Sequence, residues 1–516
     1  MQILQSYLSG EWQEGKGEGQ KIYHAINGEV VSLVNAQGLD FSSAIAYAKD
    51  NGKSLRELTF HERAQMIKAI ATHLQTNKEK FYQISYQTGA TSKDSFIDIE
   101  GGIGTMFALS SIAKKNLPNL RYDIEDEPIF LSKEGNFAGQ HILTPKEGVA
   151  VHINSFNFPC WGMLEKIACN LLAGVPAIVK PASSSAYLTQ AIVRSIVEAN
   201  ILPVGALQLI CGSVGDTFEH LDFNDMVTFT GSQNTANIIR SNKNLLQNAV
   251  PVNVEADSLN CCILGSDVKE SDMEFELFIK EVARELSIKA GQRCTCIRRV
   301  LVPTNMQDVV IEKLSAQLAK RVIGDPANEA VTVGALIDQS QVADVRAQVE
   351  ALKQDAKIVY ESTKDFTSEN PEKGCFFPIT LLRSTNPSLE SSVHNVEAFG
   401  PVSTVVGYSD LDNAVQIIKA GKGSLVSSVF SNNLDELRQW AVSSASCLGR
   451  FLMVNRDNGK ESTGHGTPMP ALIHGGPGRA GGGEELGGIR GVRHYMQRTA
   501  LQGSPAMLSH ISATQE

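Results

Sequence analysis

Long apolar runs and tryptophan are scarce in this chain of 516 residues, which contains three tryptophans and only 6% aromatic residues. No stretch reaches the roughly 20 consecutive apolar residues that a membrane-spanning helix needs, so we expect no membrane partner. The first residues lack a positively charged segment followed by a long apolar run, so we expect no signal peptide. Both absences lead us to expect a cytoplasmic protein.

Cysteine is also sparse, with nine residues at irregular spacing. Without an export signal, this usage favours reduced thiols over a disulfide framework. Cys294 and Cys296 are too close in sequence and too poor in nearby partners for a zinc site, and His465 and His474 lack ligand spacing, so we expect no metal. The 46 basic and 56 acidic residues leave a net charge of −10, which argues against nucleic acid as a partner.

What is present is the composition of an ordinary globular protein, with 42% hydrophobic and 20% charged residues. The pattern is helical from residue 42 to about 115, and from residue 148 strands alternate with helices. This alternation predicts an α/β fold with a doubly wound parallel sheet, in which ligands bind at the carboxyl ends of the strands. The polar residues and turn glycines at those ends are Asn157, Lys180, Ser183, Gly212, Gly231 and Ser232.

A second alternating block follows, and the chain divides into three predicted parts. We expect a doubly wound cofactor domain from residues 1–121 and 146–250, and an α/β catalytic domain from residues 251–455. Residues 122–145 and 480–516 would form a small β oligomerisation bridge that adds a strand to a partner's sheet, so we expect a homodimer or a higher homo-oligomer. The glycine-dense run at 475–483 is either a flexible linker or a loop that shapes the substrate mouth.

Cys294 is the candidate nucleophile, because a Gly-Gln turn at 291–292 places it between a helix-like run and a strand-like run. A free thiol has a pKa of about 8.5, so it needs a base or electropositive surroundings to react. Glu255 ends an apolar strand and is the candidate general base. The Asn157 amide could join the backbone N–H of Cys294 in holding an oxyanion. If the substrate is an aldehyde, a hydride acceptor must lie beside it.

Each of these residues also has a plainer interpretation. The remaining cysteines are best explained as small buried hydrophobes, and Cys296 as a packing or accessory thiol. Taken alone, Glu255 could be a surface charge, Lys180 a solvated strand end and Asn157 a helix cap. It is their occurrence together that favours a functional role.

The order of the motifs resembles the aldehyde dehydrogenase superfamily over nearly the whole chain. They are Asn157-Phe158-Pro159, Lys180-Pro181-Ala182, Phe229-Thr230-Gly231-Ser232, Glu255, Gly291-Gln292-x-Cys294 and Glu397-x-Phe399-Gly400-Pro401. The resemblance implies that Cys294 forms a thiohemiacetal and then a thioester. It further implies that Glu255 activates the deacylating water and that Asn157 holds the oxyanion.

The resemblance also implies a bound nicotinamide cofactor. Lys180 would bind the adenosine ribose, Ser232 the pyrophosphate, and Glu397 with Phe399 the nicotinamide riboside, while Glu485 would relay protons. NAD-preferring relatives often carry a glutamate at the position of Ser183. Serine removes a charge repulsion toward a 2′-phosphate of up to about 4 kcal/mol, so we expect NADP⁺ rather than NAD⁺.

Departures from the usual family pattern narrow the expected substrate. The base lies in Glu255-Ala256-Asp257-Ser258-Leu259, and Phe156 replaces the tryptophan usual before the oxyanion asparagine. Together with the segments His465-Gly466-Thr467-Pro468-Met469-Pro470 and Gly481-Gly482-Gly483-Glu484-Glu485-Leu486-Gly487-Gly488, these variants resemble the branch that oxidises CoA-linked semialdehydes in phenylacetate and benzoyl-CoA breakdown. The expected substrate is 3-oxo-5,6-dehydrosuberyl-CoA semialdehyde or 3,4-dehydroadipyl-CoA semialdehyde. We expect no fused hydratase, and a separate enoyl-CoA hydratase is a candidate partner.

Other functions remain open at this point. A CoA-acylating enzyme would resolve the thioester with free CoA, but such enzymes generally lack the base glutamate. A general aliphatic aldehyde dehydrogenase is a further alternative, and a non-catalytic relative would have kept only the fold.

Overall fold

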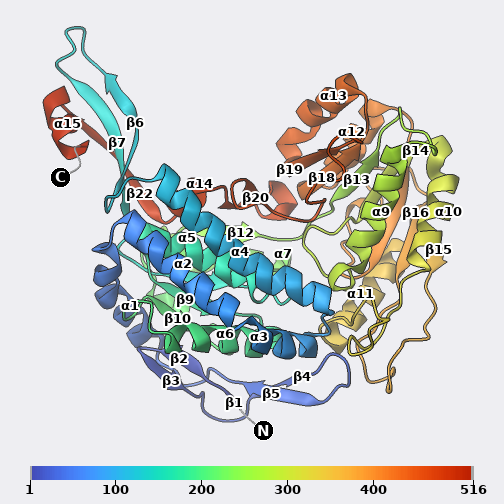
Figure 1. Ribbon diagram of the computed structural model, residues 1–516, viewed down its shortest axis with the longest axis horizontal. Coiled ribbons are helices and arrows are strands. Elements are labelled where there is room, and N and C mark those ends of the chain that lie inside the picture. Colours follow the sequence, from blue (N-terminus) through green and yellow to red (C-terminus); the bar gives the residue numbers. More distant parts are fainter. Residues whose placement is uncertain (1–2, 513–516) are drawn as a thin grey trace.

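The computed structural model describes residues 3–512 and contains two seven-stranded sheets flanked by helices, with a hairpin that projects from the body (Figure 1). The predicted α/β class is confirmed. Residues 1–2 of the expected cofactor domain and 513–516 of the expected bridge lie outside the described residues. The three-part division at the predicted boundaries stays a prediction.

The first sheet is the doubly wound one, and its strands come mainly from residues 150–255. Five strands run parallel, and two strands from the N-terminal segment extend one edge in antiparallel pairing. In spatial order they are β12 (Val252–Glu255), β11 (Met226–Thr230), β8 (Ala150–Ile153), β9 (Ala177–Lys180), β10 (Leu207–Leu209), β2 (Ser6–Leu8) and β3 (Glu11–Gln13). β12 lies beyond the predicted boundary at residue 250, yet it pairs with β11, so the strand that ends in Glu255 belongs to this sheet.

Helices cover both faces of this sheet, and several begin with strong caps. Thr59 with Glu62, and Thr91 with Asp94, form reciprocal capping boxes that satisfy the free backbone N–H groups of two helix starts. The helices are α1 (Phe41–Arg56), α2 (Phe60–Thr76), α3 (Lys78–Ser85), α4 (Ser92–Asn116), α5 (Trp161–Ala173), α6 (Ala186–Glu198), α7 (Gln233–Arg240) and α8 (Lys243–Gln247).

α4 is the one helix among residues 3–512 whose length and composition would suffice to cross a membrane. Half of its apolar window is buried inside the protein, where α4 packs against α2 and α5. That packing accounts for its apolar residues, as in a core helix.

The second sheet lies on the other side of the molecule and carries its own hydrophobic core. Its strands are parallel except at one edge. In order they are β15 (Ala356–Glu361), β16 (Thr380–Ser384), β17 (Val402–Tyr408), β14 (Arg299–Pro303), β13 (Cys261–Leu264), β18 (Ser424–Phe430) and β19 (Leu448–Val454). Its helices are α9 (Met273–Ser287), α10 (Gln307–Leu318), α11 (Gln339–Leu352), α12 (Leu411–Ala420) and α13 (Leu434–Ser444).

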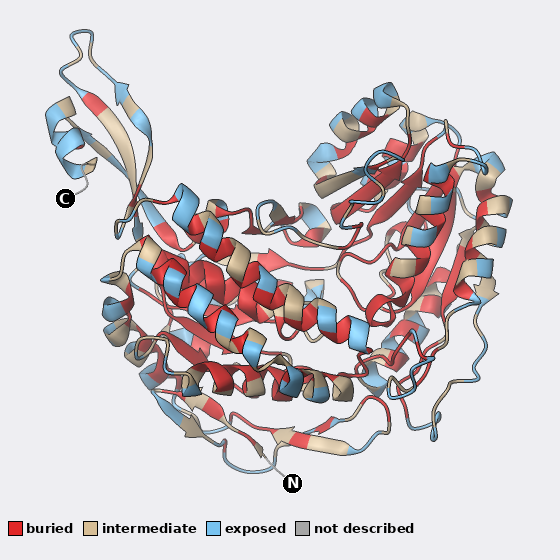
Figure 2. Cartoon of the chain, in the orientation of Figure 1, coloured by how far each residue is buried: buried red, intermediate tan, exposed pale blue. Residues whose placement is uncertain are grey.

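The projecting unit is an antiparallel sheet of β6 (Asp123–Phe130), β7 (Ala138–Pro145) and β22 (Met496–Gly503), followed by α15 (Pro505–Ser512). The expected pairing of the chain end with the 122–144 segment is therefore confirmed. The strand begins only at Met496, because residues 489–493 form the short helix α14 (Ile489–Arg493). The hairpin is largely exposed (Figure 2), and its tip carries exposed apolar side chains at Ile129, Phe130 and Leu131.

Two small sheets complete the fold, β1 (Ile3–Leu4) with β5 (Val30–Val34) and β4 (Gln20–Tyr23), and β20 (Ile473–Gly475) with β21 (Glu484–Leu486). The glycine run between β20 and β21 packs on β12. A Cβ added at Gly481 or Gly483 would lie 2.3 or 2.5 Å from the backbone oxygen of Val254. This close backbone approach excludes larger residues and shows that the run is a packed segment and not a flexible linker.

Candidate active site

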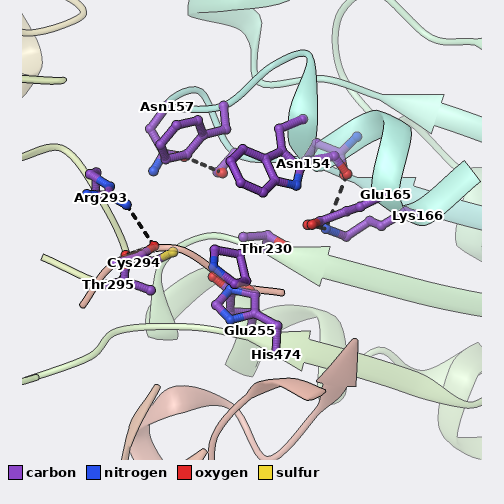
Figure 3. A pocket seen from close by; sticks show the side chains of 16 residues that line it. Asn154, Asn157, Glu165, Lys166, Thr230, Glu255, Arg293, Cys294, Thr295 and His474 are labelled. Atoms are coloured by element: carbon purple, nitrogen blue, oxygen red, sulfur yellow. Dashed lines mark hydrogen bonds and ion pairs between the residues drawn. The ribbon is translucent and has the colours of Figure 1, made fainter. Parts of the chain in front are cut away.

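The site is a pocket at the carboxyl end of the first sheet, where α5, the end of β12, the loop that carries Cys294 and residues 466–474 meet (Figure 3). Its position is the one expected for a ligand site in a parallel sheet. Its lining residues include Asn154, Asn157, Trp161, Glu165, Lys166, Thr230, Glu255, Arg293, Cys294, Thr295, Gly466, Pro468 and His474.

The loop before Cys294 has an unusual backbone. Lys289, Ala290 and Gly291 are three consecutive residues in the left-handed region, with φ values of 53°, 50° and 69°. A Cβ at Gly291 would lie 2.2 Å from the backbone oxygen of Gly400, so only glycine fits. The Gln292 side chain then fastens the turn, since it donates to Lys289 O and accepts from Ile337 N, both at 2.9 Å. The tight Gly-Gln turn predicted from the sequence is confirmed.

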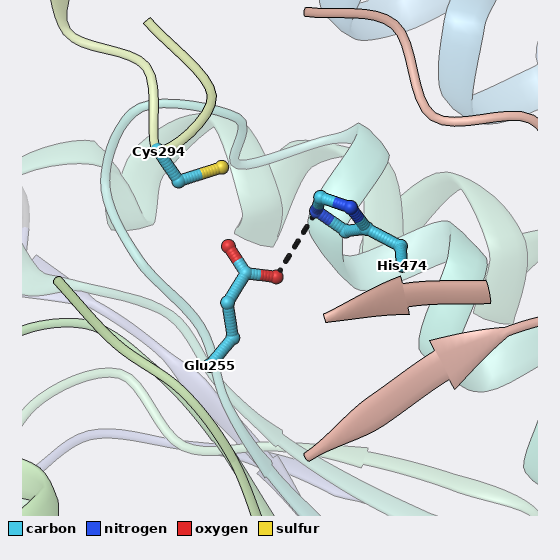
Figure 4. Close-up of side chains that lie close together, drawn as sticks. All are labelled: Glu255, Cys294 and His474. Carbon is cyan, nitrogen blue, oxygen red and sulfur yellow. Dashed lines mark ion pairs between the residues drawn. The ribbon is translucent and has the colours of Figure 1, made fainter. Parts of the chain in front are cut away.

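Cys294 and Glu255 share this pocket, and His474 joins them. Nε2 of His474 lies 3.2 Å from Oε2 of Glu255, and a ligand atom of each of the three side chains lies within 4.8 Å of the others. Figure 4 shows the three side chains pointing into one space. Glu255 and His474 are buried, and Cys294 is half-buried. The predicted convergence of the thiol and the carboxylate is therefore present in the structure.

The electrostatics of this trio are set by burial and by charge pairing. Burial by itself raises the pKa of the Glu255 carboxyl, but the His474 and Lys166 cations outweigh it and hold that pKa well below its usual range. Burial lowers the pKa of His474, yet the Glu255 carboxylate more than reverses this and raises it. Protein atoms surround the sulfur of Cys294, and this desolvation together with the Glu255 charge raises the pKa of the thiol well above its ordinary value.

Asn157 lies directly beside the nucleophile loop. Its Nδ2 donates to the backbone oxygen of Gln292 at 3.0 Å, and its Oδ1 accepts from Ser155 Oγ at 2.7 Å. The Ser155 bond holds the amide oxygen, so that the amide nitrogen is the side that meets the nucleophile loop. One N–H of the amide stays free for an oxygen bound in the pocket.

A buried ammonium group lies behind the pocket. Nζ of Lys166 on α5 is 3.1 Å from Oε2 of Glu485 and 3.7 Å from Oε1 of Glu165. Burial lowers the pKa of Lys166, but the surrounding carboxylates raise it above its ordinary value. Glu485, expected to relay protons, thus approaches the site through Lys166.

Arg293 connects the nucleophile to the loop that forms the far wall. Its guanidinium donates to Glu285 Oε1 and to the backbone oxygen of Gly466, each at 2.7 Å. The Thr295 hydroxyl donates to the same Gly466 oxygen at 3.0 Å. The residues on both sides of Cys294 therefore hold the segment that contributes Gly466 and Pro468 to the pocket.

The expected cofactor residues of the first sheet lie at neighbouring strand ends. Lys180 ends β9, Ser183 follows it, and Gly212 follows β10. Gly231 follows β11 and donates its N–H to the backbone oxygen of Glu255 at 3.1 Å. Ser232 is the N-cap of α7, and its hydroxyl accepts from Thr235 N.

Glu397 and Phe399 come from the other half of the molecule and reach the same region. Phe399 packs edge-to-face on Phe156, next to Asn157, with ring centroids 5.8 Å apart. Glu397 Oε2 accepts from Ser258 N at 2.9 Å. Burial raises the pKa of the Glu397 carboxyl to about 7, although the nearby Arg298 cation opposes the rise.

These residues fit a nicotinamide dinucleotide. Oε1 of Glu397 is buried without a hydrogen-bond partner, so it can accept from the ribose hydroxyls. At the start of α7 the N–H groups of Gly231 and Gln233 already donate to the Glu255 backbone oxygen and to the Asp257 carboxylate, so a pyrophosphate would meet the remaining backbone N–H groups of that turn. Lys180 supplies positive charge, and burial lowers the pKa of its ammonium group.

Sequence reasoning missed three site residues: His474, Arg293 and Lys166. His474 lacks metal-ligand spacing in the sequence, and no spacing signal links it to Glu255. Arg293 stands beside the nucleophile, but its partner Gly466 lies far along the chain. The expectation that no metal is bound stays a prediction.

Comparison with known proteins agrees with this geometry. The family model described as "Aldehyde dehydrogenase family" matches residues 12–501. The 3,4-dehydroadipyl-CoA semialdehyde dehydrogenase of Aromatoleum evansii is 40% identical over 478 residues, which cover 92% of this chain and 93% of that protein. Protein MaoC of Klebsiella aerogenes is 44% identical over 180 residues, which cover 35% of this chain and 52% of that protein.

Solved structures share the fold. The crystal structure of betaine aldehyde dehydrogenase from Staphylococcus aureus in complex with NAD⁺ superposes with a TM-score of 0.83 at 23% identity, covering 97% of this chain and 94% of that chain. At 23% identity this similarity supports the fold alone, and the family match is what supports the chemistry. The chain belongs to the aldehyde dehydrogenase family and is an NAD(P)-dependent oxidoreductase that acts on the aldehyde group.

Proposed function

We propose that this protein oxidises the aldehyde group of a CoA-linked semialdehyde to a carboxylate, with NADP⁺ as electron acceptor and a thioester on Cys294 as intermediate. The observation that carries the proposal is the meeting of Glu255 and Cys294, from separate segments, in one pocket beside the Asn157 amide. A nucleophile, a base and an oxyanion donor are the groups that this reaction needs.

The roles of the residues follow from their positions. The sulfur of Cys294 attacks the aldehyde carbon after losing its proton, and the carboxylate nearest to that proton is Glu255. The oxygen of the adduct accepts hydrogen bonds from Asn157 Nδ2 and the backbone N–H of Cys294. When bound, NADP⁺ accepts the hydride that leaves the adduct. Glu255 passes the thiol proton on to solvent and then takes a proton from water, whose oxygen attacks the thioester carbon. The C–S bond breaks, the acid leaves, and the sulfur takes back a proton from Glu255.

The preference for NADP⁺ rests on Ser183 and Lys180. The 2′-phosphate of NADP⁺ would meet a hydroxyl at Ser183 where a carboxylate would repel it by up to about 4 kcal/mol. The Lys180 ammonium lies at the end of the adjoining strand and favours the added negative charge. NAD⁺ is the less favoured cofactor.

The substrate class rests on the 40% identical relative, whose name states a CoA semialdehyde substrate. We propose 3,4-dehydroadipyl-CoA semialdehyde or 3-oxo-5,6-dehydrosuberyl-CoA semialdehyde, in aromatic-compound catabolism that includes phenylacetate degradation.

The exposed hairpin tip and the edge strand β22 support a homodimer or a higher homo-oligomer. A cytoplasmic location and a separate enoyl-CoA hydratase as partner belong to the same proposal.

A CoA-acylating aldehyde dehydrogenase is the rival. In that reaction free CoA resolves the thioester, and no base is needed to activate water. The buried Glu255 beside Cys294 counts against it. Turnover that requires added CoA and yields an acyl-CoA would establish the rival.

Two variants test the proposal directly. Cys294→Ala should abolish NADPH formation, and Glu255→Gln should release one equivalent of NADPH and then stall, because water is no longer activated. The control Cys447→Ala removes a half-buried thiol immediately before β19 of the second sheet and should keep turnover. Steady turnover in either site variant contradicts the proposed roles. Assaying CoA-linked and free aldehydes with both cofactors identifies the substrate class.

A further inference from the structure

His474 is buried against the carboxylate of Glu255 and has no role in the chemistry described above. It is the middle residue of β20, in a segment that is far along the chain from both Glu255 and Cys294. The pairing of β20 with β21 brings it to the pocket. The 3.2 Å contact between Nε2 and Oε2 is direct, and both side chains are less than 10% exposed. A carboxylate in such surroundings stays ionised only when a cation or several hydrogen bonds compensate for lost water.

We propose that His474 is a positioning residue whose imidazolium holds the buried Glu255 carboxylate ionised and turned toward Cys294, so that the base is ready over the working pH range. This inference rests on the proposed role of Glu255 as the base for deacylation. It adds the group that sets the protonation state of that base.

The other charged groups around His474 do not replace it. Glu165 on α5 and Glu485 on β21 are acidic, so neither can supply the positive charge that an ionised Glu255 needs, and burial raises the pKa of Glu165 to about 7. Burial also holds Cys294 as a thiol. The Arg450 cation on β19 opposes protonation of the His474 ring, and its guanidinium donates to the backbone oxygens of His465 and Thr467. Lys166 on α5 is positive, and two carboxylates already surround its ammonium group. His474 is thus the cation in direct contact with Glu255 among the described residues.

The substitution His474→Gln tests the inference, since glutamine keeps a hydrogen-bond donor and removes the charge. In infrared difference spectra against Glu255→Gln, the protonated carboxyl band of Glu255 should be absent near pH 6 in the wild type and present in His474→Gln. In the profile of kcat against pH, the acid limb of His474→Gln should move to higher pH by at least one unit. At a fixed pH on that limb, kcat should therefore be about tenfold lower than in the wild type. Neither readout depends on the maximal rate, so a general loss of activity does not imitate the result.

The matched control is His465→Gln, a buried histidine of the adjoining loop whose Nδ1 contacts Ser428 Oγ at 2.8 Å rather than Glu255. It should leave the acid limb and the band in place, whatever its effect on stability. If His474→Gln leaves both the acid limb of the kcat profile and the carboxyl band of Glu255 unchanged, the inference is overturned, while the proposed function stands. Steady turnover in Glu255→Gln would show that Glu255 is not the base. The proposed function would then fail together with the inference.

Discussion

Nδ2 of Asn157 donates a hydrogen bond to the backbone oxygen of Gln292 at 3.0 Å, which joins the candidate oxyanion donor to the loop of the nucleophile. The bond fixes the amide relative to Cys294, two residues later, before any substrate arrives. Preorganised donors of this kind stabilise the charge that develops in the transition state.

Asn157→Ala should therefore lower kcat by about 10²–10³-fold with a much smaller change in KM, because the lost bond forms mainly in the transition state. Ser155→Ala, which removes only the hydroxyl that orients the amide, should give a smaller loss in the same direction. Steady-state kinetics measure both. A loss below about tenfold in Asn157→Ala contradicts the oxyanion role.

Ser183→Glu should reverse the cofactor preference. The new carboxylate repels the 2′-phosphate and can accept from the ribose hydroxyls of NAD⁺, so kcat/KM should fall for NADP⁺ by about tenfold or more and rise for NAD⁺. Fluorescence titration with NADPH and NADH checks the same change as binding alone. A wild-type protein that already favours NAD⁺ would refute the argument from Ser183.

The buried pair of Arg293 and Glu285 should matter for stability. Arg293→Met removes the closer of the two cations beside the fully buried Glu285 carboxylate and leaves the 3.4 Å contact with Arg284, which should cost up to about 3–5 kcal/mol of the free energy of unfolding. The control Asp308→Ala breaks the pair with Arg383, where the aspartate side chain is 87% exposed, and should cost about 0–1 kcal/mol. Urea unfolding compares the two, and equal losses would show that burial does not decide the effect.

Acid should destabilise the protein through its buried histidines. Burial lowers the pKa of His152, His394 and His465 to about 3 each. Their pKa in the unfolded chain is about 6.5, so between these values the unfolded state binds more protons and stability falls as pH falls. Each of these histidines should lower the free energy of unfolding by about 2 kcal/mol between pH 7 and pH 5.

His152→Gln gives the check on that account. The variant should lose less stability than the wild type between pH 7 and pH 5, by the contribution of one histidine, in urea unfolding at the two pH values. Its buried hydrogen bonds to Thr228 and Asn170 make the variant less stable at pH 7, so the difference between the two pH values is the relevant quantity. An unchanged difference would contradict the assignment.

The alternating half of the fold could be read from the sequence because each element carries its own pattern. The helix at Trp161–Ala173 and the strand at Met226–Thr230 begin and end where their apolar runs do. The strand expected from residue 490 begins only at Met496, since a short helix at 489–493 comes first. β2 and β3 carry no pattern of their own, because three-residue strands take their structure from the sheet they join.

The site was predictable only where residues stand in local motifs. Glu255 ends an apolar strand and Cys294 follows a Gly-Gln turn, so each could be identified without coordinates. The contact of His474 with Glu255 comes from the pairing of β20 with β21 and the packing of the glycine run on β12. Such contacts depend on tertiary packing, and no periodicity in the sequence encodes them.

The covalent step is the central claim, and mass spectrometry of the acid-quenched Glu255→Gln variant tests it most directly. After mixing with a CoA-linked aldehyde and NADP⁺, the peptide that contains Cys294 should carry the mass of the acyl group, in an amount equal to the NADPH released. NADPH release with no adduct, or an adduct on a different cysteine, would contradict the account.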